Sequence, residues 1–385
     1  MKRFKMERFG VALAVIALLL LLAGSESQAS TGTILDLMPS VNILTDDKEH
    51  VMPLYGVPGE EVYTLAQLAE LLTQDDIDKI REGKFTAAYC SQNWTTDWNK
   101  SFGQGMTAAL SALNIQLLTV TDAKNDPVAQ IADCESVIQM LPDLMIIFCQ
   151  SPDALAPVAK EATSRGIKVV FLNGEPTNSV QGVDFIGSVF TDSWSMGYYS
   201  MYEMCKKISE EGGGQVAIVE NIYMNYDQTL RTQGAHDAAA EFSNIEVVSA
   251  PAVGFTAQLS ADNGESLAMA YPDLKGVWYM WSDLSVAAVT AIRNLGRTTI
   301  ACSPEINIGS AVNMANQGGF YASCSSNGAN NGIAAVLMGA LGLIEKEAPR
   351  FVMTLTVRVL RETLEEAWPL CYNQTLPGQI ERLLN

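Results

Sequence analysis

Short, continuously apolar segments alternate with amphipathic segments along most of the chain, and this alternation constrains the fold more than any other feature. Leu144–Cys149 and Lys168–Leu172 contain the runs MIIF and VVFL, which show no polar alternation. Strands of this kind are buried on both faces, as in a parallel sheet covered by helices. The intervening segment Asp126–Met140 begins with Asp-Pro, an N-cap followed by proline at the first helical position. The sequence therefore predicts βα units of a doubly wound sheet.

The βα units form two successive series. In the first, we expect strands at Phe85–Cys90, Ile115–Thr119, Leu144–Cys149 and Lys168–Leu172. In the second, we expect strands at Phe185–Val189, Gln215–Glu220, Ile245–Ser249, Gly276–Met280 and Thr299–Cys302. Two series of about 100–150 residues each predict an α/β protein with two doubly wound parallel-sheet lobes and a ligand cleft between them. The predicted hinge strands are three crossings, near Ser188–Thr191, Ser326–Gly328 and Thr354–Val357.

These patterns divide the chain into four parts. Residues 1–29 are read as a signal peptide, and residues 30–82 as an irregular N-terminal arm followed by helix, with a second helix beginning near Thr73. The N-terminal lobe is expected to comprise 83–188 plus 327–353. The C-terminal lobe is expected to comprise 189–326 plus 354–385.

The first residues have the composition of a secretory signal. Basic residues from Lys2 to Arg8 precede the unbroken apolar run Val11–Ala23, and Ser27-Gln-Ala29 offers small residues for cleavage after Ala29. The alternative is a membrane anchor, but thirteen helical residues span only about 20 Å of a hydrocarbon core about 30 Å thick. A bacterial lipoprotein is disfavoured because the first cysteine is Cys90. We expect export to the periplasm or another extracytoplasmic compartment.

Composition excludes several classes of function. The net charge of −19 argues against nucleic acid and against an anionic membrane surface as partners. The two histidines, His50 and His236, are far apart, which disfavours metal sites and Ser-His or Cys-His nucleophiles. Gly103-Gln-Gly105 lacks the third glycine of a dinucleotide fingerprint, and no P-loop, G-x-S-x-G, H-E-x-x-H or C-x-x-C motif occurs. We therefore expect no enzyme, no metal and no cofactor.

Seven cysteines in an exported chain leave at least one thiol unpaired within the molecule. Cys90 and Cys149 end predicted buried strands, where a free cysteine behaves as a small hydrophobic residue. We expect mostly free, buried thiols, and Cys302–Cys324 is the one bridge that the sequence suggests testing.

Polar and aromatic residues follow the predicted strands. In open α/β sheets, ligands bind beyond the carboxyl ends of the strands, where this chain places Trp94, Trp98, Tyr226, Phe255 and Trp281 among many Asn, Asp, Ser and Thr residues. Hydroxyl groups require paired donors and acceptors, and the C–H face of a sugar packs on an aromatic ring. These residues favour a sugar or polyol as the ligand.

Several segments resemble the ribose/galactose-type (type I) periplasmic binding proteins. The similarity lies in Val120–Asp133, in Ser151–Pro157 with Gly166–Asn173, in Gly214–Glu220 and in Tyr271–Val277, and covers roughly residues 83–357. Gly83–Tyr89 with Asp97-Trp98 resembles a branch of sugar-uptake solute receptors. The lactose-repressor group shares this fold, but carries a helix-turn-helix where this chain has its predicted signal peptide.

The resemblance implies a set of binding residues. Trp98 and Phe255 correspond to the aromatic walls of the two lobes, and Asn173 to a residue that binds sugar hydroxyls. Ser282, Glu305 and Ser326 fall near an amide, an aspartate and a glutamine of the family.

Two family arginines are absent. Gly174 stands where an arginine often follows the residue equivalent to Asn173, and Thr229 aligns with a second ligand-binding arginine. Arg231 matches a neighbouring arginine with a structural role. These differences imply a less charged, more aromatic site than that of a simple pentose receptor.

The resemblance implies an exported, monomeric solute-binding receptor for a membrane permease of an ABC-type importer. The receptor would close on a small carbohydrate or polyol by bending at its hinge and would catalyse no reaction. The alternative is a sensor of the same fold that presents its ligand to a membrane receptor. An exported hydrolase is disfavoured because no nucleophile and base are paired in the sequence.

Overall fold

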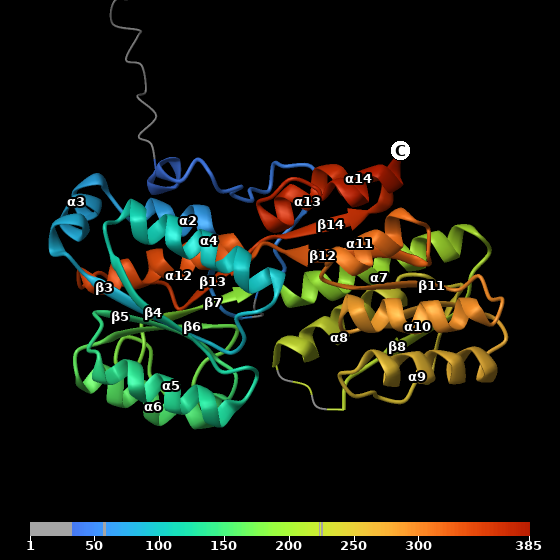
Figure 1. The fold of residues 1–385 in the computed structure, drawn as a ribbon, viewed down its shortest axis with the longest axis horizontal. Helices are drawn as coiled ribbons and strands as arrows, with labels where there is room; N and C mark the ends of the chain where they lie inside the picture. The colour runs from blue at the N-terminus through green and yellow to red at the C-terminus, as the bar shows by residue number, and fades with distance from the viewer. Residues whose placement is uncertain (1–32, 57–58, 223, 225) are drawn as a thin grey trace, which may run out of the picture.

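The fold is described from a computed structural model, which covers residues 33–56, 59–222, 224 and 226–385. The predicted signal peptide lies outside these residues. The chain forms two lobes, each built on a seven-stranded sheet with helices on both faces (Figure 1). None of the helices in the described part of the chain is long and apolar enough to cross a membrane.

The N-terminal lobe contains a sheet in the order β2-β13-β7-β6-β5-β3-β4, in which every neighbouring pair is parallel. Its strands are β2 (Val62–Tyr63), β3 (Thr86–Ser91), β4 (Gln116–Asp122), β5 (Leu144–Phe148), β6 (Lys168–Leu172), β7 (Gly187–Thr191) and β13 (Phe351–Thr354). Its helices are η1 (Ile34–Leu37), α2 (Leu65–Glu70), α3 (Gln74–Gly83), α4 (Asp97–Ala112), α5 (Pro127–Gln139), α6 (Pro152–Ser164) and α12 (Gly328–Leu343).

The C-terminal lobe contains a sheet in the order β1-β14-β12-β11-β10-β8-β9. Its strands are β1 (Val51–Met52), β8 (Gly214–Val219), β9 (Ile245–Val248), β10 (Leu274–Tyr279), β11 (Ile300–Pro304), β12 (Phe320–Ser326) and β14 (Thr356–Leu360). Its helices are α7 (Ser193–Glu210), α8 (Tyr226–Ala240), α9 (Ala257–Ala270), α10 (Ser282–Asn294), α11 (Ile308–Ala315), η2 (Arg361–Thr363), α13 (Leu364–Tyr372) and α14 (Gly378–Leu384).

The apolar strands are buried on both faces, as predicted. Leu144 and Ile146 of β5 belong to the core that β5 shares with α4 and α12, whereas Met145 and Ile147 belong to the core beneath α5 and α6. Successive side chains of a strand point to opposite faces, so a strand covered by helices on both sides needs apolar residues at every position.

Strand β14 departs from the prediction of wholly parallel lobes. It pairs antiparallel with both β12 and β1. Only Leu355 separates β13 from β14, so the chain enters the second sheet without the long crossover connection that would turn it parallel to its neighbour.

Three chain crossings join the lobes where the sequence placed them. The chain passes from β7 to α7 after Thr191, from β12 to α12 after Ser326, and from β13 to β14 at Leu355. Helix α5 (Pro127–Gln139) lies within one residue of the predicted range Asp126–Met140 at each end.

The sequence predicts irregular chain over residues 30–60 followed by helix, and the structure differs from this in containing two short paired strands. Val51 pairs with Val357 in the C-terminal sheet, and Val62 pairs with Phe351 in the N-terminal sheet. These strands have only two residues each, too few for a period-2 pattern to be recognised among the prolines and glycines of the arm.

All seven cysteines are free and buried. Cys302 and Cys324 lie on the adjacent strands β11 and β12, but Cys302 is in register with Ala322, and Cys324 with Pro304. The offset of two residues separates the two sulfur atoms, and the suggested bridge is not formed.

Candidate ligand-binding site

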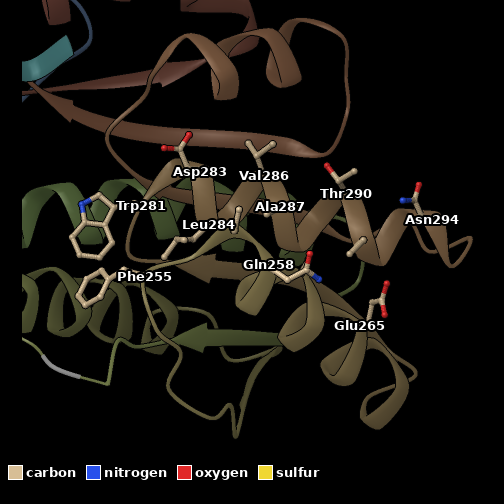
Figure 2. Close-up of a pocket in the computed structure, with 13 residues that line it drawn as sticks. Phe255, Gln258, Glu265, Trp281, Asp283, Leu284, Val286, Ala287, Thr290 and Asn294 are labelled. Atoms are coloured by element: carbon tan, nitrogen blue, oxygen red, sulfur yellow. The ribbon is translucent and has the colours of Figure 1, made fainter. Parts of the chain in front are cut away.

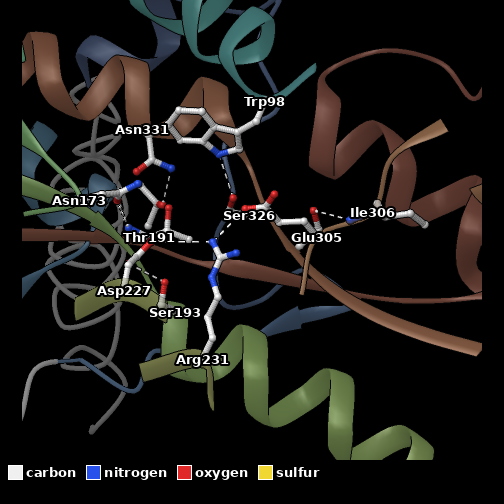
Figure 3. A network of polar contacts seen from close by, with 12 residues as sticks. Trp98, Asn173, Thr191, Ser193, Asp227, Arg231, Glu305, Ile306, Ser326 and Asn331 are labelled. Atoms are coloured by element: carbon white, nitrogen blue, oxygen red, sulfur yellow. Dashed lines mark hydrogen bonds and ion pairs between the residues drawn. The ribbon is translucent and has the colours of Figure 1, made fainter. Parts of the chain in front are cut away.

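Four of the predicted site residues lie near one another between the lobes, in separate hydrogen-bond and ion-pair groups that we together call the polar network. Trp98, Asn173, Glu305 and Ser326 come from α4, from the ends of β6 and β11, and from the end of β12 (Figure 3). The network therefore lies where the carboxyl ends of strands from both lobes adjoin the chain crossings, as the strand-end rule requires.

Trp98 forms an aromatic wall on the N-terminal lobe. Its ring stacks on Phe102 with centroids 5.6 Å apart and contacts Phe148 edge-on at 6.3 Å. Its Nε1–H donates to Ser326 Oγ over 2.9 Å. Helix α4 can place Trp98 against Ser326 because α4 and α12 touch backbone to backbone, where a Cβ on Gly105 would overlap the Ala329 carbonyl group.

Asn173 fastens the end of β6 to the first crossing. Its Oδ1 accepts a hydrogen bond from Thr191 N at 3.1 Å, and its backbone has a left-handed φ of 52°. Asparagine adopts this conformation more easily than other non-glycine residues. At the third crossing, Asn331 of α12 donates from Nδ2 to Thr354 Oγ1 over 2.9 Å. Polar side chains thus hold the crossings beside Trp98 and Ser326.

The second lobe contributes a buried group of charges. Arg231 Nη2 lies 2.9 Å from Glu305 Oε1 and 3.9 Å from Asp227 Oδ2, and the Arg231 side chain is only 6% exposed. Ser193 Oγ donates to Asp227 Oδ1 over 2.7 Å, which ties α8 to the first crossing.

Burial changes the ionisation of this group. Burial raises the pKa of Asp227, and Arg231 only partly offsets that rise. Burial alone would lower the pKa of Arg231, but the carboxylates of Glu305 and Asp227 raise it above its ordinary value. Arg231 therefore stays charged and compensates Glu305. Glu305 itself has a left-handed φ of 61°, a strained conformation for a non-glycine residue.

The other predicted residues lie outside this network. Trp94 packs half-buried on the N-terminal core, and its backbone N–H donates to Asp122 Oδ1 over 3.1 Å. Tyr226 is 54% exposed at the start of α8. Ser282 is buried as the first residue of α10.

Phe255 lies against Trp281 at one end of a groove between α9 and α10. The two rings are 5.0 Å apart, and Phe255 is 53% exposed (Figure 2). The groove encloses about 850 Å³ and extends along the helices toward Glu265 and Asn294. Only its aromatic end is formed by the residues that follow β9 and β10. The polar network between the lobes is thus distinct from the body of the groove.

Four residues at or near the site are not among those that the sequence predicts to bind the ligand. Trp281 lies two residues after the end of β10 and satisfies the same strand-end rule as Phe255. Asp227 and Arg231 are four residues apart on α8, a spacing that indicates an ion pair but gives no sign of the third member, Glu305. Asn221 follows β8 and is 3% exposed, and neither polar atom of its amide has a partner among the described residues.

The described residues contain one cluster with metal-ligand spacing, formed by Glu49, His50 and Glu366. His50 Nε2 lies 2.9 Å from Glu366 Oε2, while the two glutamate side chains are 85% and 71% exposed. A hydrogen bond between the imidazole and Glu366 accounts for this geometry. The cluster fastens the arm to α13 and has no contact with the network around Ser326.

Two doubly wound lobes, three crossings and a polar network between them define a two-lobed ligand-binding protein. The chain belongs to the periplasmic binding protein domain family, whose sequence model matches residues 87–345. This result confirms the resemblance seen in the sequence.

Individual relatives are distant. The chain is 23% identical to the xylitol-binding protein of Mycolicibacterium smegmatis over 226 residues, which are 58% of this chain and 63% of that protein. The chain therefore spans less than two thirds of the length of that relative.

Among solved structures, the chain resembles a periplasmic solute-binding protein of an ABC transporter from Actinobacillus succinogenes with bound D-allose. The TM-score is 0.64 at 19% identity, covering 74% of this chain and 100% of that one. A solute-binding protein from Agrobacterium vitis bound with α-D-tagatopyranose gives a TM-score of 0.64 at 18% identity, covering 76% of this chain and 100% of that one. About a quarter of this chain thus lies outside the matched fold.

Proposed function

We propose that this protein is an exported solute-binding receptor of an ABC-type importer and that it binds a small sugar or polyol between its lobes. The observation that carries the proposal is the network in which Trp98, Asn173, Glu305 and Ser326 meet at the chain crossings. The relatives bind xylitol, D-allose and tagatopyranose, all of which are neutral and rich in hydroxyl groups.

The charges of the site favour an uncharged ligand. Arg231 compensates Glu305 within the protein, so neither charge needs a partner on the ligand. Asn221 offers a buried amide whose donor and acceptor have no partner among the described residues, which matches the dual character of a hydroxyl group. Trp98 and the Phe255–Trp281 pair offer aromatic faces for the C–H surface of a sugar.

Binding is proposed to close the lobes. A ligand that touches Trp98 on one lobe and Asn221 on the other makes all its contacts only when the lobes approach, so it stabilises the closed state. The φ and ψ angles of the residues at the three crossings, next to Thr191, Ser326 and Leu355, would change during this motion. Transport then requires a permease that receives the closed form, and the predicted signal peptide would bring the receptor to that permease.

The proposal is tested by a thermal-shift screen of residues 30–385 against sugars and polyols, including xylitol and D-allose. A ligand at one hundred times its Kd stabilises the folded state by about 2.7 kcal/mol and raises the Tm. Calorimetry then compares Trp98→Ala and Trp98→Phe with the parent protein. We expect a loss of affinity of roughly ten- to 150-fold for Trp98→Ala, as when stacking worth about 1.5–3 kcal/mol is removed.

Met269→Ala is the matched control, because Met269 lies on α9 and is 70% exposed. It should bind as the parent protein does. The ligand class is wrong if no sugar or polyol raises the Tm. The site is wrong if Trp98→Ala binds with unchanged affinity.

A further inference from the structure

The N-terminal arm links the two lobes in addition to the three crossings. We define the arm strap as the described residues of 33–63, which pack on the N-terminal lobe, then on the C-terminal lobe, and then on the N-terminal lobe again. Figure 1 shows the arm in blue, running from above the N-terminal lobe to α13. The arm precedes residues 87–345, which the family model matches.

The first pass of the arm strap is short. Ile34, Met38 and Val41 are buried in the core of the N-terminal lobe, and Leu44 is buried in the core of the C-terminal lobe. The three Cα–Cα steps from Val41 to Leu44 can span at most about 11 Å. Because so few residues join the two cores, the distance between Val41 and Leu44 can increase little when the lobes move apart.

Hydrogen bonds fasten this pass to both lobes. Asn42 N donates to Asn373 Oδ1 over 2.8 Å, and Asn42 Nδ2 donates to the Pro369 carbonyl oxygen of α13 over 2.9 Å. Leu44 N donates to Oδ1 of Asn330, which belongs to α12 of the N-terminal lobe, over 2.8 Å. The pass therefore bridges α12 and α13 directly beside the second crossing.

The second pass is fastened at the first crossing. Tyr55 N donates to Asp192 Oδ2 over 2.7 Å, and the Tyr55 ring stacks on Trp194 with centroids 4.0 Å apart and planes 14° apart. Val51 pairs with the C-terminal sheet before this contact, and Val62 pairs with the N-terminal sheet after it. An edge strand on each sheet thus anchors the two ends of the second pass.

We propose that the arm strap limits the angle through which the lobes separate and so holds the ligand-free protein close to the interlobe orientation seen here. The three crossings alone can bend together. The two passes of the arm strap are anchored on both lobes and oppose that bending. By narrowing the range of open states, the strap raises the fraction of binding-competent molecules, which sets the apparent affinity. The inference rests on the proposed hinge motion and not on the chemistry of the ligand.

The test measures the interlobe distance distribution of ligand-free protein by double electron–electron resonance. Spin labels are attached at Val128→Cys on α5 and Met269→Cys on α9, which are 74% and 70% exposed, while the native thiols are buried. In one variant, a flexible Gly/Ser linker of about ten residues follows Gly59 and slackens the second pass without removing its anchors. In a second variant, Leu44→Ala loosens the first pass.

Each variant has a matched control. The same linker after Gly296 lies in a turn within the C-terminal lobe, where, as at Gly59, a side chain would meet no atom within 4 Å. Leu155→Ala removes an equally buried leucine from α6 within the N-terminal lobe. We expect broader distributions shifted to longer distances for both arm variants, and the parent distribution for both controls.

Parent-like distributions in both folded arm variants would overturn the proposal, and so would equal broadening in the controls. Cooperative thermal unfolding shows that a variant is folded. If Leu44→Ala fails to fold, the linker variant alone decides, because it leaves every buried side chain in place. No ligand enters this experiment, so its outcome is independent of whether a sugar or polyol binds.

Discussion

Replacement of Arg231 by methionine should destabilise the protein strongly, and by an amount that depends on pH. At an effective dielectric constant of about 20, unit charges 2.9 Å apart attract by about 6 kcal/mol, and charges 3.9 Å apart by about 4 kcal/mol. The cost of burying the guanidinium offsets much of this attraction. Removing one member of a buried pair typically costs about 3–5 kcal/mol, because a charge is left unpaired. We expect a loss in this range for Arg231→Met at pH 8.

The sign of the pH dependence follows from Asp227. Burial raises the pKa of Asp227 in the folded protein, and Arg231 and the Ser193 hydrogen bond partly offset that rise, so the pKa rises further in Arg231→Met. A carboxyl group with a raised folded pKa binds its proton more tightly in the folded state, which favours folding as the pH falls toward the unfolded value of about 4. The stability deficit of the variant should therefore shrink from pH 8 to pH 5. Asp227→Asn added to Arg231→Met should recover stability at pH 8.

Urea unfolding at both pH values, followed by tryptophan fluorescence, measures these differences. Arg165→Met is the control, because Arg165 forms an exposed pair with Glu161 on α6 and should cost less than about 1 kcal/mol at either pH. A loss below about 1 kcal/mol for Arg231→Met, or an equal loss at pH 5 and pH 8, would refute the argument that a buried charge group connects α8 to the end of β11.

Three further outcomes are expected. The Lys346 ammonium lowers the pKa of Asp76 to about 2, so Lys346→Met should lose less than about 1 kcal/mol at pH 7, and the difference should vanish as the pH falls through 2 in acid titrations. Gly105→Ala should lower the Tm by more than 5 °C in calorimetry, because its methyl group would overlap the Ala329 carbonyl group, and a parent-like Tm would contradict this packing. A reducing agent should leave the Tm unchanged, because all seven thiols are free, whereas a drop of more than 10 °C would reveal a disulfide.

The sequence predicted the fold well because burial on both faces leaves a local signal. Runs such as MIIF in β5 identify a covered strand without knowledge of its neighbours. Turn chemistry also acts locally: Gly166 ends α6 with a φ of 84°, and Thr73 caps α3 through Asp76. The paired strands β1 and β2 left no such signal, because two-residue strands depend on partners about 300 residues away.

The site was predicted less completely for the same reason. The strand-end rule identifies which loops adjoin the interlobe region, but not which side chains turn inward. Ser326 and Trp98 meet although they are 228 positions apart, while Tyr226 and Ser282 satisfy the rule yet lie outside the network. The resemblance implies a structural role for Arg231. The structure shows Arg231 in a buried ion pair, and its partner is the predicted site residue Glu305.

The structure bears on the two family arginines that this chain lacks, because the nearby Arg231 is paired within the protein with Glu305. An arginine that binds a ligand needs a guanidinium group that can pair with that ligand. The guanidinium group of Arg231 is instead paired with the carboxylates of Glu305 and Asp227. Gly174 packs against Cys149, where a Cβ would lie 2.8 Å from the cysteine Cβ, so that position could not accept an arginine without movement of Cys149. The departure at Gly174 is therefore enforced by packing. We infer that the proposed ligand is held by amides, hydroxyls and aromatic faces, and that its binding depends only weakly on salt.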